Sequence, residues 1–142
     1  MRDLFPVLAH TLLVRNDQVL LLRRAHTGYL DGWYALPGGH LQRGESIVAC
    51  AIRECLEETG LVLDPARVRP AAVMPYRSAD QQGVDFIMAC DAIAGEPRLG
   101  EPDRFDDVRW FGVDALPRNA APYIEHAIAL ARSGDWFFEF SG

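Results

Sequence analysis

The chain has 142 residues, of which 49% are hydrophobic and 24% are charged, and its formal net charge is −6. These values are typical of one globular domain over residues 1–142, and they disfavour a broad nucleic-acid-binding surface, which is normally basic. The first residues lack the apolar core of a secretory signal, and no apolar run approaches the roughly 18 residues of a membrane span. A cytoplasmic protein without membrane contact is therefore expected.

The N-terminal part of the chain predicts a β-hairpin and a further short strand. Two apolar runs flank Asn16-Asp17, which is a turn signal, and Pro37-Gly38-Gly39 is expected to break regular structure. The loop expected between hairpin and short strand covers residues 25–32. The predicted strands cover residues 7–14, 19–24 and 33–36.

A helix is expected from about Ser46 to Glu58, with Ser46 as its N-cap and Gly60 just beyond its end. Its core-facing apolar positions recur at helical spacing and are Val48, Ala51, Ile52 and Cys55. Ile47 and Cys50 fall outside this stripe, close to a row of acidic residues. Part of the acidic face is therefore expected to be covered by protein.

The second half of the chain predicts three strands and a second helix. The strands cover residues 68–76, 84–91 and 107–111, with a polar connection at 78–83. Asn119 is a candidate N-cap for a helix that runs to about Arg132, before Gly134. The core-facing positions expected for this helix are Ala120, Ile124, Ala127, Ile128 and Ala131.

The aromatic tail at residues 136–140 is expected to be extended. It is interpreted as a core-packing segment, with an oligomer contact as the alternative, so homodimerisation stays open. The three cysteines, an odd number, predict reduced and buried or half-buried thiols. This order of elements predicts an α/β (α+β) fold, in which a mixed β-sheet lies between helices.

Glu54, Glu57 and Glu58 are spaced i, i+3 and i+4, which places three carboxylates on one face of the predicted helix. Carboxylates this close repel one another, so a positive partner is expected among them. A hard divalent cation with oxygen ligands fits this role, and Mg²⁺ (with Mn²⁺ as a substitute) is the predicted cofactor. A calcium-binding EF-hand is excluded, because its ligands alternate along a loop.

The stretch from Gly39 to Leu61 resembles the signature of the Nudix hydrolase family, G-x5-E-x7-R-E-U-x-E-E-x-G-U, at every fixed position. Seven fixed positions at roughly 6% frequency each match by chance on the order of 10⁻⁹ times per start site. One mild departure is Cys55, which stands where a bulkier aliphatic residue is usual. The flanking pattern, with W-Y-A-L-P-G-G before the segment and Trp110-Phe111 after it, extends the resemblance over most of the chain.

The resemblance implies a Nudix fold and divalent-metal-dependent hydrolysis of a phosphoanhydride bond. It also implies that the metal ligands are the Gly39 carbonyl and the carboxylates of Glu54, Glu57 and Glu58. Glu54 is the first candidate for general base and Glu57 the second. Arg53 lies one helical turn before Glu57, so it is expected to hold Glu57 in place and is grouped with the catalytic residues.

Two further acids have alternative interpretations. Glu45 is expected to pair with Arg53 or to accept hydrogen bonds from backbone donors, or else to be an ordinary acid of the first helical turn. Glu101 matches the late loop from which some relatives supply an additional metal ligand, and its alternative is a solvated loop acid. His40 directly follows Gly39 and is a candidate for contact with the active site.

Substrate-binding residues are predicted with less support from the signature. Of the adjacent residues Arg23 and Arg24, Arg23 is expected to reach the phosphates, with a solubilising edge residue as the alternative. Asp107, next to Asp106, is expected to contact the nucleotide. The aromatic candidates for stacking on a base are Tyr29, Trp33, Tyr76 and Phe86.

The expected substrate is a small nucleotide in which a nucleoside diphosphate is linked to another group. A (deoxy)nucleoside triphosphate, cleaved to the monophosphate and pyrophosphate, is favoured by the small size of the chain. Pro75 hints at ADP-ribose relatives and Tyr76 at dinucleoside polyphosphate relatives, so these two markers cancel. The alternatives are an ADP-ribose or nucleoside diphosphate sugar pyrophosphatase, and a nucleotide sensor without turnover.

Overall fold

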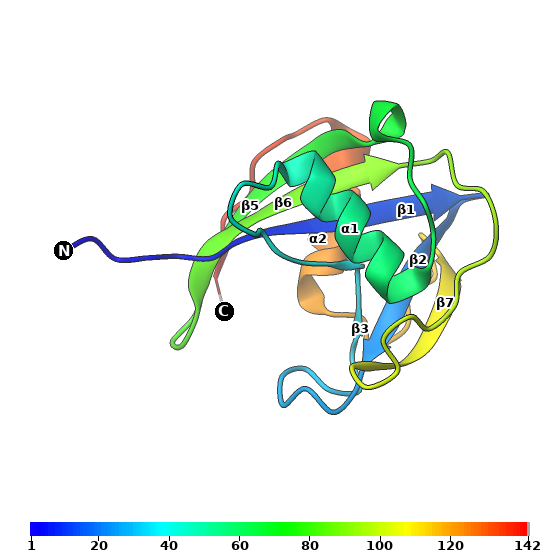
Figure 1. Cartoon of the computed structure of the whole chain (residues 1–142), viewed down its shortest axis with the longest axis horizontal. Coiled ribbons are helices and arrows are strands. Elements are labelled where there is room, and N and C mark those ends of the chain that lie inside the picture. Colours follow the sequence, from blue (N-terminus) through cyan, green and yellow to red (C-terminus); the bar gives the residue numbers. More distant parts are fainter. Residues whose placement is uncertain (142) are drawn as a thin grey trace.

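The structure is a computed structural model that describes residues 1–141 (Figure 1). Its strands are β1 (Val7–Arg15), β2 (Gln18–Arg24), β3 (Tyr34–Ala35), β4 (Gly38–His40), β5 (Arg69–Arg77), β6 (Gln82–Cys90), β7 (Phe105–Gly112) and β8 (Phe140–Ser141). Its helices are α1 (Ile47–Thr59), the short 3-10 helix η1 (Pro65–Arg67) and α2 (Pro122–Ser133). The predicted strands and helices are therefore present, with boundaries shifted by a few residues.

Strand β1 is central to the mixed sheet. It pairs in parallel with β6 along most of its length, and in antiparallel orientation with β4 near its start and with β2 at its end. Strand β5 pairs with β6 and, in parallel, with β8, while β7 and β3 pair with β2. Helix α1 covers one face of the sheet and α2 the other (Figure 1). The predicted mixed sheet between helices is thus confirmed.

The turn between β1 and β2 has the expected hairpin chemistry. Asn16 and Asp17 have φ angles of 54° and 60°, both in the left-handed region. Two consecutive left-handed residues match the twist of the flanking strands, and Asn and Asp tolerate this conformation better than most residues. The hairpin prediction is confirmed at residue level.

The core has two parts, one on each face of the sheet. The part beneath α1 contains the fully buried residues Ala9, Leu13, Leu20, Cys50 and Cys55. The part beneath α2 contains Leu12, Leu21, Ile87, Ile124 and Ala127. Because strand side chains alternate between faces, residue 10 of β1 points to the α2 side and residue 11 to the α1 side.

Helix α1 begins and ends as the sequence predicts. The Ser46 hydroxyl accepts a hydrogen bond from the Ala49 N–H at 3.0 Å, and Gly60 has a φ of 75°. The prediction that protein covers part of the acidic face is also confirmed, because Cys50 is fully buried and Glu58 is 1% exposed.

Three local predictions are wrong. Asn119 does not cap α2, because the helix begins at Pro122, whose fixed φ suits a first helical position, and the Asn119 amide donates to the Gly32 carbonyl instead. Ala131 is exposed, and Leu130 is buried in its place. The glycines expected to break regular structure form β4, because β1 supplies hydrogen-bond partners for them.

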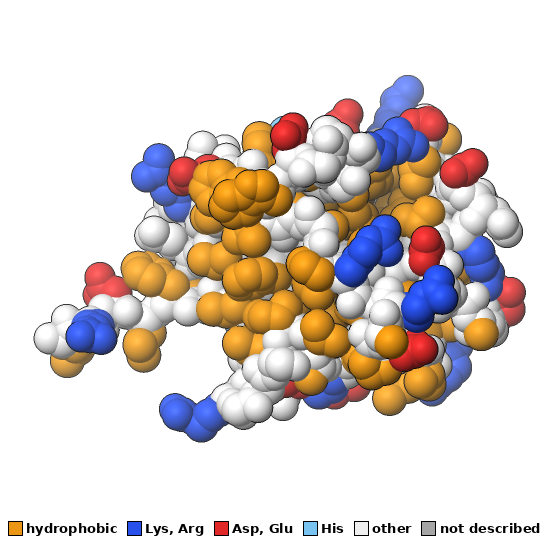
Figure 2. Space-filling view, turned by 90° about the horizontal axis from the view of Figure 1, so that it is seen from above, with side chains coloured by type: hydrophobic (Ala, Val, Ile, Leu, Met, Phe, Trp, Pro, Cys, Tyr) orange, Lys and Arg blue, Asp and Glu red, His pale blue; other side chains and the backbone are white. Residues whose placement is uncertain are grey.

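The C-terminal segment is extended and lies along β5. The Val73 N–H donates to the Trp136 carbonyl, and the Phe138 N–H donates to the Val73 carbonyl. Phe138 packs onto the core, whereas Trp136 and Phe137 are 67% and 45% exposed. Figure 2 shows one face of the molecule on which hydrophobic side chains gather. An oligomer contact of the tail stays a prediction.

Two further observations concern the whole chain. Cys50, Cys55 and Cys90 are buried and carry free thiols, as predicted. Among the helices of the described residues, none has the length and apolar character that crossing a lipid bilayer requires.

Candidate functional site

The centre of the site is the place where β4 meets α1. A Cβ atom added to Gly39 would lie 2.6 Å from Oε1 of Glu54, and the Gly38 N–H donates to Oε1 of Glu58 at 2.8 Å. A side chain at residue 39 would therefore collide with the Glu54 carboxylate, whereas a side chain at residue 38 would collide with Ala9 and His10 of β1. This geometry brings the predicted residue Gly39 together with two of the predicted acids.

The three predicted carboxylates of α1 differ in their environment. Glu58 is 1% exposed and Glu54 is 8% exposed, whereas the Glu57 side chain is 44% exposed. Burial raises the pKa of Glu58 well above its ordinary value, and the negative charges of Glu54 and Glu101 raise it further. A negative charge on Glu58 is therefore unfavourable without a positive partner.

Arg53 holds the acidic residues together through several hydrogen bonds. Its Nε and Nη2 donate to Glu45 at 2.6 and 3.0 Å, and its Nη1 donates to Glu54 at 2.9 Å. Contacts to Glu57 are longer, at 3.3 and 3.5 Å, and Nη2 also donates to the His40 carbonyl. Arg53 was expected to hold Glu57, but its shortest hydrogen bonds are to Glu45 and Glu54.

The Arg53→Lys variant is expected to be about 10-fold or more less active and about 1–3 kcal/mol less stable. A lysine keeps the charge but cannot make the bidentate contact with Glu45 while also reaching Glu54. Steady-state kinetics and urea unfolding measure both effects. The matched control is Arg132→Lys, which changes an exposed arginine paired with Asp114. Equal activity of the Arg53→Lys variant and the wild type would contradict the positioning role.

Glu45 lies before the helix, and it makes both of the predicted interactions, an ion pair with Arg53 and a hydrogen bond from a backbone donor. It pairs with Arg53 and accepts a hydrogen bond from the Gln42 N–H at 3.1 Å. The hydrogen bond from Arg53 is the largest effect and lowers the pKa of Glu45 from its ordinary 4.5 to about 2, despite partial burial. Glu45 is therefore a structural partner of Arg53.

This lowered pKa predicts an acid-dependent loss of stability. The folded protein binds the Glu45 proton less readily than the unfolded chain does, so the stabilisation is complete above about pH 4.5 and is lost as the pH falls to about 2. We expect Glu45→Gln to cost about 1–2 kcal/mol at pH 7 and almost nothing near pH 2. Urea unfolding at several pH values measures this, with the exposed Glu96→Gln as control. A difference independent of pH would contradict it.

The loop before β7 delivers Glu101 to the end of α1. The Gly100 N–H donates to the Glu58 carbonyl and the Arg98 N–H to the Thr59 carbonyl, both at 2.9 Å. Oε1 of Glu101 is buried without a hydrogen-bond partner among residues 1–141. Burial and the charges of Glu54 and Glu57 raise the pKa of Glu101, although Arg104 opposes them. Glu101 is therefore not a fully solvated loop acid, and its role as a metal ligand stays a prediction.

Arg104 is a site residue that the sequence interpretation missed. Its Nη1 lies 3.7 Å from Oε1 of Glu101, its charge acts on Glu58, and about half of its side chain is exposed. An exposed cation beside the carboxylates is suited to bind a phosphate group of a substrate. The sequence did place Arg104 three residues after the candidate ligand Glu101, and this spacing could have indicated a basic residue near the site.

The comparisons with known proteins agree with this geometry. The family profile described as NUDIX domain matches residues 5–131. The chain belongs to the Nudix family. It is therefore a Nudix hydrolase, and the resemblance of its Gly39–Leu61 segment to the family signature is confirmed.

The Nudix relatives include several kinds of enzyme. An ADP-ribose pyrophosphatase from Methanocaldococcus jannaschii is 27% identical over 117 residues, which are 82% of this chain and 68% of the relative. An NAD-capped RNA hydrolase from Vibrio cholerae is 31% identical over 73% of this chain and 36% of the relative. The chain thus spans less than half the length of the NAD-capped RNA hydrolases that it matches.

Solved Nudix structures have the same fold. The crystal structure of a MutT NUDIX hydrolase from Burkholderia pseudomallei superposes with a TM-score of 0.83 and is 28% identical, covering 90% of this chain and 98% of that one. A MutT/nudix family protein from Enterococcus faecalis, 19% identical, superposes with a TM-score of 0.79 over 94% of this chain and 63% of that one. The latter similarity concerns the fold alone.

The donor set of this Nudix site fits a divalent cation. Carboxylate oxygens of α1, a nearby backbone carbonyl and Oε1 of Glu101, which accepts no hydrogen bond within residues 1–141, are the kind of oxygen ligands that Mg²⁺ and Mn²⁺ prefer. In residues 1–141, no set of three or more acidic, histidine or cysteine side chains is already closed around a common point. Arg53 donates to Oε1 of Glu54 and makes longer contacts to Glu57, whereas the second oxygen of Glu54 accepts no hydrogen bond within residues 1–141.

The predicted substrate residues lie on a different part of the sheet. Arg23 and Asp107 face each other in the β2–β7 pair, but Arg23 donates to Asp106 at 2.6 Å and Asp107 accepts from the Tyr34 hydroxyl. Neither makes a hydrogen bond or ion pair to the α1 acids in the described chain. Arg24, the neighbour of Arg23, donates to the Tyr29 carbonyl and to the Thr27 hydroxyl in the loop after β2.

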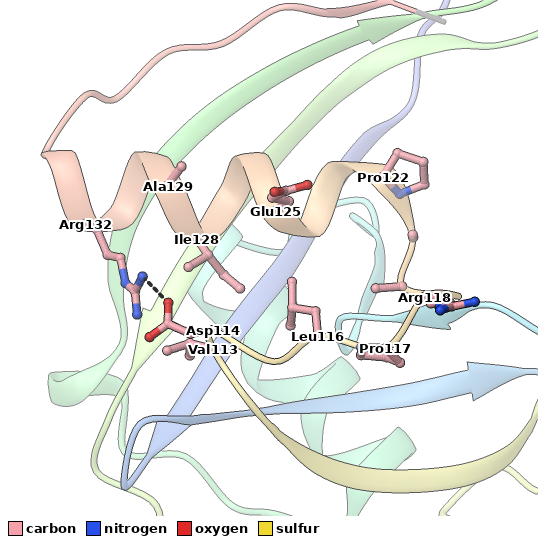
Figure 3. Close-up of a pocket in the computed structure, with 12 residues that line it drawn as sticks. Val113, Asp114, Leu116, Pro117, Arg118, Pro122, Glu125, Ile128, Ala129 and Arg132 are labelled. Atoms are coloured by element: carbon pink, nitrogen blue, oxygen red, sulfur yellow. Dashed lines mark hydrogen bonds and ion pairs between the residues drawn. The ribbon is translucent and has the colours of Figure 1, made fainter.

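A hollow elsewhere on the surface is not part of this site. It measures about 580 Å³ and lies between α2 and the segment after β7, where an ion pair joins Asp114 to Arg132 at 2.9 Å (Figure 3). Its lining contains neither the α1 carboxylates nor Glu101. The polar constellation around β4 and α1, rather than this hollow, is the candidate active site.

Proposed function

We propose that this Nudix hydrolase cleaves the phosphoanhydride bond of a nucleoside diphosphate linked to a second group. The observation that carries the proposal is the placement of the Glu54 and Glu58 carboxylates against the side-chain-free strand of Gly38 and Gly39. Glu101, on the loop held at the end of α1, adds a buried carboxylate oxygen that accepts no hydrogen bond within residues 1–141. Together these oxygens suit a cation-assisted phosphoryl transfer to water.

The cation would be held by Glu54, Glu57, Glu58 and Glu101 together with the Gly39 carbonyl. When bound, it supplies positive charge to the non-bridging oxygens of the diphosphate. Arg104 binds a phosphate oxygen at the exposed side of the site. These assignments keep the negative charge of the substrate compatible with the acidic surroundings.

Glu54 is proposed as the general base. Its Oε1 accepts a hydrogen bond from Arg53, which fixes the carboxylate, whereas its Oε2 has no hydrogen-bond donor among residues 1–141. Oε2 is therefore available to take a proton from the attacking water. Glu57, more exposed and more loosely held by Arg53, is the second candidate.

The relatives favour a substrate with a nucleoside on a diphosphate bridge. Their names specify ADP-ribose and NAD-capped RNA, both of which contain an adenosine diphosphate linked to a further sugar. ADP-ribose or a related nucleoside diphosphate sugar is therefore the first candidate. A (deoxy)nucleoside triphosphate, the substrate expected from the sequence, is the second candidate.

The decisive experiment incubates the purified protein and Mg²⁺ with ADP-ribose, NAD, NAD-capped RNA and the nucleoside triphosphates, and identifies the products. AMP with ribose 5-phosphate supports the first candidate, and a monophosphate with pyrophosphate supports the second. The control is the same panel with EDTA and with the Glu57→Gln variant. No turnover of any compound would overturn hydrolysis, and nucleotide binding without turnover would indicate a sensor.

A further inference from the structure

His10 and Asp85 form a largely buried polar pair on the α2 side of the sheet. This side is opposite the face of β4 on which the α1 carboxylates lie. Nδ1 of His10, on β1, donates to Oδ2 of Asp85, on β6, at 2.7 Å. The two side chains are 15% and 12% exposed. A buried charged group is costly unless it is paired, so this pair needs a role that an apolar pair of the same volume would not fill.

The His10 ring contacts the back of the catalytic strand. β4 pairs with β1 so that Gly38 lies opposite His10, and a Cβ atom added to Gly38 would lie 2.5 Å from Cδ2 of the ring. The Gly38 N–H on this same residue donates to Oε1 of Glu58. The two glycines of β4 therefore lie between the imidazole on one side and the acidic carboxylates of α1 on the other.

Helix α2 contributes Tyr123, which contacts both His10 and the backbone that leads into β4. The centroids of the Tyr123 and His10 rings are 5.5 Å apart. The Tyr123 hydroxyl accepts a hydrogen bond from the N–H of Leu36, two residues before Gly38. Burial lowers the pKa of His10, but the carboxylates of Asp85 and Glu54 raise it by more.

Asp85 has a second, unused hydrogen-bonding atom. Its Oδ1 is buried and has no partner in the described part of the chain, although the residue is 8% exposed. Only one of the two carboxylate oxygens of Asp85 accepts a hydrogen bond from His10, and burying the other without a partner costs folding free energy. Packing alone would not require a carboxylate at this position. Its presence favours a role in fixing the orientation of the imidazole, as carboxylates do for histidines in other sites.

We propose that His10 and Asp85 are positioning residues that hold the Gly38–Gly39 strand against the α1 carboxylates and thereby set cation affinity and turnover. The inference rests on the proposed function, because the cation site belongs to it. His10 supports the strand through its ring edge, and Asp85 fixes the ring. Neither residue touches the reacting atoms.

The test measures Mn²⁺ binding without substrate, by electron paramagnetic resonance, and then kcat and KM separately. His10→Ala is expected to weaken Mn²⁺ binding and lower kcat by about 10- to 100-fold, with KM changed less than about threefold. His10→Asn is expected to stay within about threefold of wild type, since its amide nitrogen replaces Nδ1 and its amide oxygen occupies the place of Cδ2. Near-normal Mn²⁺ binding and kcat in His10→Asn, beside the losses in His10→Ala, would distinguish a positioning role from a general loss of packing.

The control is His126→Ala, which removes a histidine that stacks on Phe138 at 4.3 Å. Circular dichroism verifies folding, and should His10→Ala fail to fold, Asp85→Asn is measured with the same expected direction. Unchanged Mn²⁺ affinity in a folded His10→Ala variant overturns the inference, as does His10→Asn behaving like His10→Ala. Because Mn²⁺ binding requires no turnover, a negative nucleotide panel leaves this test intact, whereas a wild type that binds no Mn²⁺ overturns both.

Discussion

The Glu54→Gln variant is expected to hydrolyse its substrate about 10²–10⁴ times more slowly than the wild type, which is the usual contribution of a general base. Glutamine has the same shape, and its carbonyl oxygen can still accept the hydrogen bond from Arg53. It cannot take a proton from water, so kcat falls while folding is retained. Steady-state kinetics with product detection measure the change.

The control is Glu125→Gln, which alters an exposed acid on α2, away from the β4 strand. Its kinetics are expected to match the wild type within twofold. If Glu54→Gln kept more than a tenth of wild-type kcat while Glu57→Gln lost 100-fold or more, the base would be Glu57. Retention of activity in both variants would remove the α1 carboxylates from the chemistry altogether.

The Glu58→Gln variant is expected to be more stable than the wild type in EDTA and to lose stabilisation by Mg²⁺. Glu58 is 1% exposed and accepts its hydrogen bond from Gly38, which a glutamine carbonyl also accepts. Removing a buried charge is expected to gain at least about 1 kcal/mol, or about 3–5 °C in Tm for a chain of this size. The wild type instead gains about 2.7 kcal/mol at a cation concentration 100 times its Kd.

The pH dependence follows from the raised pKa of Glu58. In EDTA, the unfolded chain releases this proton near pH 4.5, whereas the folded protein retains it to higher pH, so stability falls as the pH rises through this window. Glutamine removes this contribution, and the difference between variant and wild type should therefore grow with pH. Thermal melts from pH 4.5 to 8, with and without Mg²⁺, test it. A variant that is less stable in EDTA, or still stabilised by Mg²⁺, would contradict the role given to Glu58.

Features that depend on neighbouring residues were accessible from the sequence. Ser46 and Gly60 bound α1 through local hydrogen bonds and backbone conformation, and the i, i+3, i+4 spacing of the acids places them on one face. The turn at Asn16 and Asp17 is equally local. Such signals are short-range, so they survive without knowledge of the tertiary fold.

The alternation rule was not enough to choose between Arg23 and Arg24. It states that adjacent strand residues face opposite sides, but the β2–β7 register shifts between these two residues. Arg23 then pairs with Asp106, and Arg24 donates to the Tyr29 carbonyl and Thr27 hydroxyl. A bulge depends on the partner strand, which the sequence of β2 does not specify.

Long-range pairings were equally inaccessible. His10 and Asp85 are 75 positions apart, and only the parallel register of β1 and β6 brings them together. The approach of Glu101 depends on Gly100, whose hydrogen bond to the Glu58 carbonyl belongs to a loop without regular structure. Residue type alone gave no reason to select His10 among the four histidines.

The course of the C-terminal segment along β5 has a practical consequence for handling the protein. The hydrogen bonds from residues 136–141 occupy backbone groups of β5 that would otherwise be open to another molecule. Shortening the gene product after α2, or fusing a bulky purification tag close to Phe140, would free this strand for edge-to-edge association. An N-terminal fusion avoids this hazard, since the first six residues form no strand and are exposed.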